Sequence, residues 1–80
     1  MDRRLVLISV RGTLTAISDG ELGNTIVSIL WPARSQEEAE EAVREKLIER
    51  MKGFSLKVES LLLVAEQISI PGYRITVEEI

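Results

Sequence analysis

The side chains most suited to chemistry in this 80-residue chain are grouped glutamates, Glu37, Glu38, Glu40 and Glu41. Carboxylates can act as general acid and base, or bind Ca²⁺, when they converge on a cleft or a turning loop. These glutamates lie in a segment with helical spacing, and carboxylates along one helix do not converge on a point. We therefore expect them to stabilise the start of a helix, where the macrodipole favours negative charge.

Other catalytic groups are scarce. The chain has no histidine, the commonest acid–base group and metal ligand, and no cysteine for a disulfide. A lysine acts as a base only when it is buried, yet Lys46, Lys52 and Lys57 fall at polar positions of the pattern. The sequence therefore predicts a protein that is not an enzyme, with no catalytic residue, no metal site and no cofactor.

The segment 18–24, SDGELGN, contains two turn dipeptides, Asp19-Gly20 and Gly23-Asn24. Anion-binding glycine loops need a defined glycine spacing and a helix that follows. Here the β-branched run TIVSILW follows instead. We expect a hairpin loop over 18–24 and a return strand over 25–31, ended by Pro32 because proline lacks a backbone donor.

A first strand is predicted over 4–17, because apolar and β-branched residues recur there with a period of two. The side chains expected to face the core are the even-numbered ones, Val6, Ile8, Val10, Leu14 and Ala16. Gly12 interrupts this series, and an interior glycine favours a bulge or a bend at that position.

A helix is predicted from Ser35 to Gly53. Ser35 as N-cap and Glu38 three residues later form a capping box, and Gly53 stands where a C′ glycine is expected. Basic residues follow the glutamates, an order that suits the macrodipole at both ends. The apolar stripe consists of Ala39, Ala42, Val43, Leu47, Ile48 and Met51.

A third strand is predicted over 54–65, and a short fourth strand over 73–79 after the Pro71-Gly72 turn. In the third strand, alternation assigns one set of apolar side chains to the core: Phe54, Leu56, Val58, Leu62 and Val64. The fold class is therefore α+β, a single domain over 1–80 with ββαββ order. It combines a small, mostly antiparallel sheet with one amphipathic helix on one face. The strand order stays open.

One helix covers only one face of such a sheet. The face left uncovered is predicted to carry Leu5, Leu7, Ile17, Leu61 and Leu63. Exposed apolar clusters of this kind mark association, and a small domain without a disulfide gains stability from a second copy. We therefore expect a homodimer joined through this face or an edge strand. The alternative is that the segment 66–70 of the same chain covers these leucines.

The predicted function is a non-catalytic protein–protein interaction or scaffold module, self-associating and open to a further protein partner. No apolar run approaches the length that spans a bilayer, and the N-terminus lacks a signal-peptide pattern, so we expect a soluble cytoplasmic protein. A second possibility is a small acidic inhibitor of a basic protein, since the formal net charge is -3.

A third possibility is RNA binding by a local basic patch of Arg3, Arg4, Arg11, Lys57 and Arg74. The strand–glycine–strand start and the helix start around Ala33 and 37–39 loosely resemble a small large-subunit ribosomal protein family of archaea and eukaryotes. The resemblance covers about residues 5 to 58 and implies a strand–strand–helix–strand core. The acidic balance and the lack of aromatic residues on the uncovered face disfavour nucleic acid as the partner.

Overall fold

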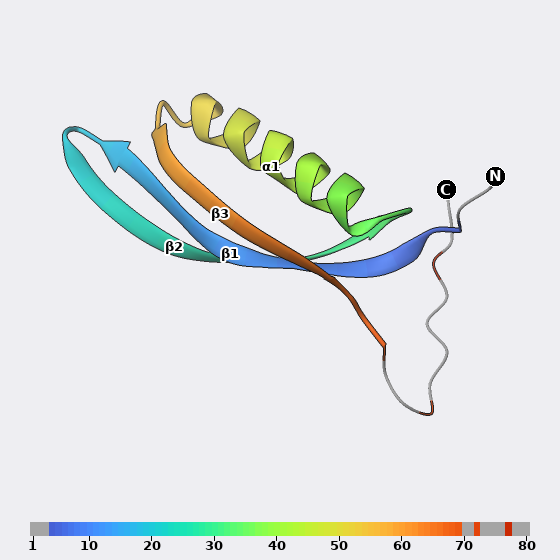
Figure 1. The fold of residues 1–80 in the computed structure, drawn as a ribbon. Coiled ribbons are helices and arrows are strands. Elements are labelled where there is room, and N and C mark those ends of the chain that lie inside the picture. Colours follow the sequence, from blue (N-terminus) through green and yellow to red (C-terminus); the bar gives the residue numbers. More distant parts are fainter. Residues whose placement is uncertain (1–3, 70–71, 73–76, 78–80) are drawn as a thin grey trace.

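The computed structural model describes residues 4–69, 72 and 77. The elements are strand β1 (Val6–Ser18), strand β2 (Glu21–Ala33), helix α1 (Gln36–Gly53) and strand β3 (Lys57–Gln67), as Figure 1 shows. The α+β class predicted from the sequence is confirmed. The fourth strand predicted over 73–79 falls on residues outside those described, apart from Val77.

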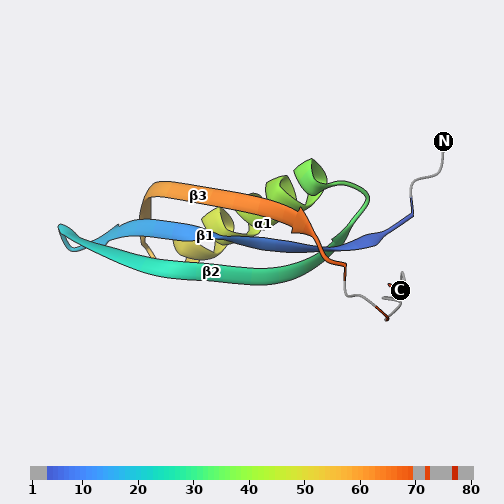
Figure 2. The same cartoon turned by 60° about the horizontal axis from the view of Figure 1, so that its bottom comes forward.

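The three strands form one antiparallel sheet in the order β2-β1-β3, so β1 is central and the other two are edges. Helix α1 lies along one side of this sheet, and the strands bow around it (Figures 1 and 2). We call the side under α1 the helix face and the opposite side the open face.

The β1–β2 hairpin is tighter than the sequence predicted. Asp19 and Gly20 both have positive φ, 52° and 80°, and Ser18 pairs directly with Glu21. Such a two-residue turn matches the twist of the flanking strands. Gly23 and Asn24 are therefore strand residues, and β2 begins at Glu21 rather than at residue 25.

The prediction that Pro32 ends the second strand is wrong. Pro32 pairs with Leu7, and pairing continues to Ala33. The Leu7 carbonyl accepts a hydrogen bond from the Ile68 amide at 3.0 Å, and Ile68 follows β3 on the side of β1 opposite to β2. The Leu7 backbone is therefore directed away from Pro32. An edge-strand residue at this non-bonded position needs no N–H, and proline fits there at no cost in hydrogen bonds.

Helix α1 begins as predicted. The Ser35 hydroxyl accepts a hydrogen bond from the Glu38 amide at 3.1 Å. The Glu38 carboxylate turns back and accepts from the Arg34 amide at 3.1 Å, one residue before the N-cap. Both bonds satisfy donors at the start of the helix region, so the glutamate serves helix capping.

The end of the helix differs from the prediction that Gly53 occupies the C′ position. Gly53 is the last helical residue, and the positive φ of 59° belongs to Ser55. The Leu56 amide donates to the Met51 carbonyl at 2.9 Å and the Ser55 amide donates to the Lys52 carbonyl at 3.0 Å. These two bonds form a Schellman motif with Ser55 as C′.

Strand β3 departs most from its predicted pattern. It begins at Lys57, and Phe54 caps the helix with 64% of its surface exposed. The register shifts between Thr15 and Ala16, whose partners are Ser60 and Val58, so Glu59 is an extra residue. This bulge reverses the alternation beyond it, because side chains change face with every residue.

The bulge places Leu61 and Leu63 on the helix face and Leu62 and Val64 on the open face. Leu61 is buried, Leu63 packs against the core, and Leu62 and Val64 are 71% and 62% exposed. The predicted assignment of these four residues to the two faces is therefore wrong.

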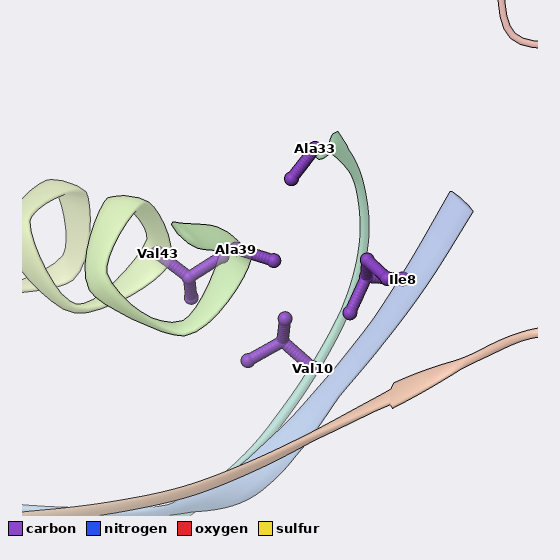
Figure 3. Packing of buried hydrophobic residues seen from close by; sticks show 5 residues of the cluster. All are labelled: Ile8, Val10, Ala33, Ala39 and Val43. Carbon is purple, nitrogen blue, oxygen red and sulfur yellow. The ribbon is translucent and has the colours of Figure 1, made fainter. Parts of the chain in front are cut away.

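The core lies between α1 and the helix face in two clusters. One consists of Ile8, Val10, Ala33, Ala39 and Val43, whose side chains point toward one another in Figure 3. The other, toward the C-terminal end of α1, consists of Leu14, Val27 and Leu61. The even-numbered face predicted for β1 and the apolar stripe predicted for α1 are thus confirmed, with Leu47, Ile48 and Met51 packed against these clusters.

Gly12 is neither a bulge nor a turn, as its partners Val27 and Leu63 are in regular register. A Cβ atom at Gly12 would overlap the carbonyl oxygen of Leu62. The central strand therefore approaches the β3 backbone too closely for any side chain, which is a known role of glycine inside a strand.

Candidate interaction surface

The open face is organised in rows of three side chains, one from each strand. Thr13 of β1 lies between Ile26 of β2 and Leu62 of β3, and Arg11 lies between Ser28 and Val64. Because neighbouring strands bring paired residues within side-chain contact distance, each row is a local surface unit. In both rows the residue on the central strand is polar and the residue on β3 is apolar.

On the open face the most exposed apolar side chains lie on the two outer strands, where they alternate with polar residues, and the middle of the central strand is polar. On β1 the outward residues between the two ends of the strand are Ser9, Arg11, Thr13 and Thr15. The apolar side chains of the outer strands are exposed to 67% at Leu22, 84% at Ile26, 58% at Leu30, 71% at Leu62 and 62% at Val64. We call Leu22, Ile26 and Leu30 the β2 rim, and Leu62 and Val64 the β3 rim.

The residues predicted for an interface lie in different places. Leu5 precedes β1, and Leu7 and Ile17 lie at the two ends of its open face, all three half-buried. Leu61 and Leu63 belong to the helix face and take part in the core. Both rims were missed as interface residues, although the alternation of Ile26, Ser28 and Leu30 with core residues in TIVSILW already indicates two apolar faces on β2.

The segment 66–70, considered as an alternative cover for these leucines, does not fold over the sheet where it is described. Glu66 and Gln67 complete β3, and Ile68 continues beside it, with its amide bound to the Leu7 carbonyl at 3.0 Å. Residues 66–68 therefore continue alongside β1 as far as Leu7 and do not cover the rims.

The basic side chains described on the open face do not form a cluster, and one of them, Arg11, is paired with a carboxylate. The Arg11 guanidinium lies 3.7 Å from the Glu66 carboxylate, and both side chains are about two-thirds exposed, 66% and 63%. Lys57 lies opposite Ile17, toward the hairpin and away from Arg11. Of the aromatic residues described, Trp31 packs on the helix face and Phe54 lies at the end of α1. The described open face thus lacks the stacked aromatics and basic groove that RNA recognition uses.

The free edge of β3 is protected. An Arg44 guanidinium nitrogen donates to the Leu61 carbonyl at 2.8 Å, and another contacts the Glu40 carboxylate at 3.2 Å. The bulge at Glu59 adds an irregularity to the same strand. Covering side chains and bulges are two ways in which proteins prevent an edge from pairing with another chain.

Among the described residues, the free edge of β2 has neither a bulge nor a side chain bound to its outward backbone groups. Its register with β1 is continuous over all 13 residues of the strand. Because the Leu7 backbone is directed toward Ile68, alternation directs the backbone groups of every second β2 residue outward. The outward-directed residues are Leu22, Asn24, Ile26, Ser28, Leu30 and Pro32, all of them exposed.

A hollow of about 570 Å³ lies where the hairpin extends past the C-terminal end of α1. Its lining includes Leu14, Ala16, Gly23, Met51 and Leu56. Small residues of the helix face form its floor, so the hollow exists because the hairpin is longer than the helix that covers it.

The glutamates of α1 do not form a site. Glu38 caps the helix and Glu40 contacts Arg44 at 3.2 Å, while Glu37 and Glu41 are exposed. Within the described ranges, no group of three or more acidic, histidine or cysteine residues is arranged to hold a metal ion. No described helix is long and apolar enough to cross a membrane.

Comparison of the chain with protein-family models, with curated proteins and with solved structures gave no match.

Proposed function

We propose that this protein is a non-catalytic interaction module that associates with a second copy of itself through the apolar open face or an edge strand of its sheet. The observation that carries the proposal is the exposure of the two rims, 84% at Ile26 and 71% at Leu62, on a face that no described segment covers. Exposed apolar patches bordered by polar residues are typical of protein–protein contact sites.

The size of the core supports the same proposal. The fully buried side chains are aliphatic and few, and α1 itself buries only Ala39 and Val43. A chain of 80 residues buries about 60% of the surface that its unfolded form exposes, which leaves a single small domain marginal in stability. Burial of the rims in a dimer would add apolar burial that the single protomer lacks.

Light scattering coupled to size-exclusion chromatography tests this proposal. We expect the molar mass of two chains at high micromolar concentration. A double variant, Ile26→Thr with Leu62→Thr, keeps good strand formers but removes apolar surface from both rims, so we expect it to shift toward the mass of one chain.

Phe54→Thr is the matched control, because Phe54 is also exposed, at 64%, but lies at the end of α1. We expect its molar mass to equal that of the unmodified chain. A single-chain mass for the unmodified protein at high micromolar concentration would refute self-association.

A further inference from the structure

We infer that the second copy binds through β2, and that the two β2 strands pair antiparallel about a twofold axis at Ile26, so that two three-stranded sheets become one. This inference rests on the proposed function and names the edge, the register and the partner. It follows from the outward backbone groups of β2, the symmetry of its side chains and the charged groups that lie near its two ends.

The backbone groups define the register. Between the Asp19-Gly20 turn and Pro32, the β2 residues that direct an N–H outward are Leu22, Asn24, Ile26, Ser28 and Leu30. An axis at Ile26 pairs all of these donors with one another: Leu22 with the partner's Leu30, Asn24 with the partner's Ser28, and Ile26 with itself. An axis shifted toward Ser28 brings Pro32, which lacks a donor, into the ladder. An axis shifted toward Asn24 leaves Leu30 without a strand partner.

The side chains of the same residues are symmetric about Ile26. Read outward from Ile26 in either direction, the open face of β2 presents a polar residue and then a leucine: Asn24 and Leu22 on one side, Ser28 and Leu30 on the other. A twofold interface uses the same patch on both subunits and therefore requires such self-complementarity. In this register leucine meets leucine, isoleucine meets isoleucine, and amide meets hydroxyl, so a second copy matches this edge better than an unrelated strand.

Complementary charges lie near the two ends of β2 on the helix face, Glu21 on the strand itself and Lys46 on α1 beside Trp31. Glu21, at the hairpin end, would lie opposite the partner's Trp31 in this register. The Lys46 ammonium lies 5.8 Å from the centre of the Trp31 ring in each protomer. Each Glu21 carboxylate is thereby brought to a lysine of the other subunit, and the contact occurs twice because of the symmetry.

The hollow beside the hairpin supports the same arrangement. Gly23, on its floor, has no atom within 4 Å of the position of a Cβ. Gly23 would lie opposite the partner's Ile29, whose side chain is on the helix face. The partner thus supplies an apolar wall to a hollow of about 570 Å³ that a single protomer leaves open.

Spin labelling tests the register directly. The chain has no cysteine, so a single substitution provides a unique label position. We expect a spin label at Ile26→Cys to show strong dipolar broadening in the continuous-wave spectrum, because residues paired on a twofold axis are about 5.5 Å apart between Cα atoms. The control is Val64→Cys, an exposed position on β3, which we expect to show none.

The outcomes separate this inference from the proposed function. Broadening at position 26 but not at position 64, in a sample with dimer mass, supports the β2 register. A dimer mass with broadening only at position 64, or at neither position, overturns the β2 inference and leaves self-association intact. A monomer mass for the unmodified chain at high micromolar concentration overturns both.

Charge exchange provides a second test that does not depend on labels. We expect Glu21→Lys to raise the dimer dissociation constant about tenfold, because two symmetry-related charge attractions become repulsions. Glu21→Lys combined with Lys46→Glu should restore most of the affinity. Failure of the second change to rescue the first, with both variants folded by circular dichroism, would contradict the register.

Discussion

Strands β1 and β2 have the same length, 13 residues each, and share one continuous ladder, yet their outward side chains differ in kind. β1 has a neighbour on both sides and presents polar residues such as Arg11 and Thr13 on the open face. β2 has one neighbour and presents the apolar rim that includes Ile26, 84% exposed. Apolar residues on this face are therefore concentrated where pairing is incomplete.

The two edge strands, β2 and β3, differ from each other in how their free edges are protected. Strand β3 is also an edge with an apolar rim, but Arg44 binds its Leu61 carbonyl and the bulge at Glu59 disturbs its pairing. The same molecule thus protects one edge and leaves the other regular. This asymmetry is the reason for assigning the pairing with a second copy to β2 and not to β3.

The largest expected effect is that of Gly12→Ala in β1, compared with the same change at Gly23 in β2. We expect Gly12→Ala to lower the free energy of unfolding by about 4 kcal/mol or more, because its Cβ would overlap the Leu62 carbonyl oxygen and the strands would have to separate. Gly23→Ala, with open space at its Cβ, should change it by less than about 0.5 kcal/mol in the monomer. Urea denaturation measures both, and equal losses would show that β1 and β2 are under the same packing constraint.

A smaller effect is expected from truncation of one isoleucine in each strand. Ile8 is 1% exposed and Ile26 is 84% exposed. Ile8→Ala should cost about 3 kcal/mol, the range for buried isoleucine truncations, whereas Ile26→Ala should cost less than about 0.5 kcal/mol at concentrations where the protein is monomeric. At higher concentration the Ile26 variant should lose the stabilisation that dimerisation gives the unmodified chain. Concentration-independent melting of the unmodified chain would argue against this distinction.

The smallest effect concerns a side-chain contact between the two strands. The Thr15 hydroxyl donates to the Asn24 side-chain oxygen at 2.8 Å on the open face, where solvent is close. We expect Thr15→Val to change stability by about 0.5 kcal/mol, because solvent-exposed hydrogen bonds contribute little beyond those that water supplies. A double-mutant cycle with Asn24→Ala measures the interaction free energy between these two side chains. A value above about 1.5 kcal/mol would contradict the expectation that this exposed hydrogen bond contributes little to stability.

The sequence predicts the fold well where periodicity is unbroken. The even-numbered face of β1, the Ser35 cap and the apolar stripe of α1 follow from spacing alone and agree with the structure. Glu59 could not be recognised as a bulge, because an extra strand residue is visible only against its partner strand. That single residue reversed the faces of Leu61 to Val64 and moved the predicted interface.

Other differences have local causes. Pro32 and Gly23 carry signals that usually end a strand. Pro32 occupies an edge position where no N–H is needed, and Gly23 lies where a Cβ would have no neighbour within 4 Å. Ser55 adopts a positive φ more typical of glycine, so the glycine two residues earlier was taken for the helix terminator. The β2 rim was accessible to sequence reasoning, since Ile26 and Leu30 alternate with core residues, but its exposure depended on knowing which strands are edges.

The length of the hairpin relative to the helix has a mechanical consequence. Beyond Leu14 the ladder of β1 with β2 continues to the Asp19-Gly20 turn, while the buried core stops. Local opening requires little free energy where few apolar contacts are lost, so the distal end can fray reversibly while the proximal half stays folded. The half of the sheet packed under α1 is therefore expected to hold its shape, while the hairpin end bends or opens more easily. This end includes Glu21 and Leu22, which lie at the start of the edge to which a second copy would pair.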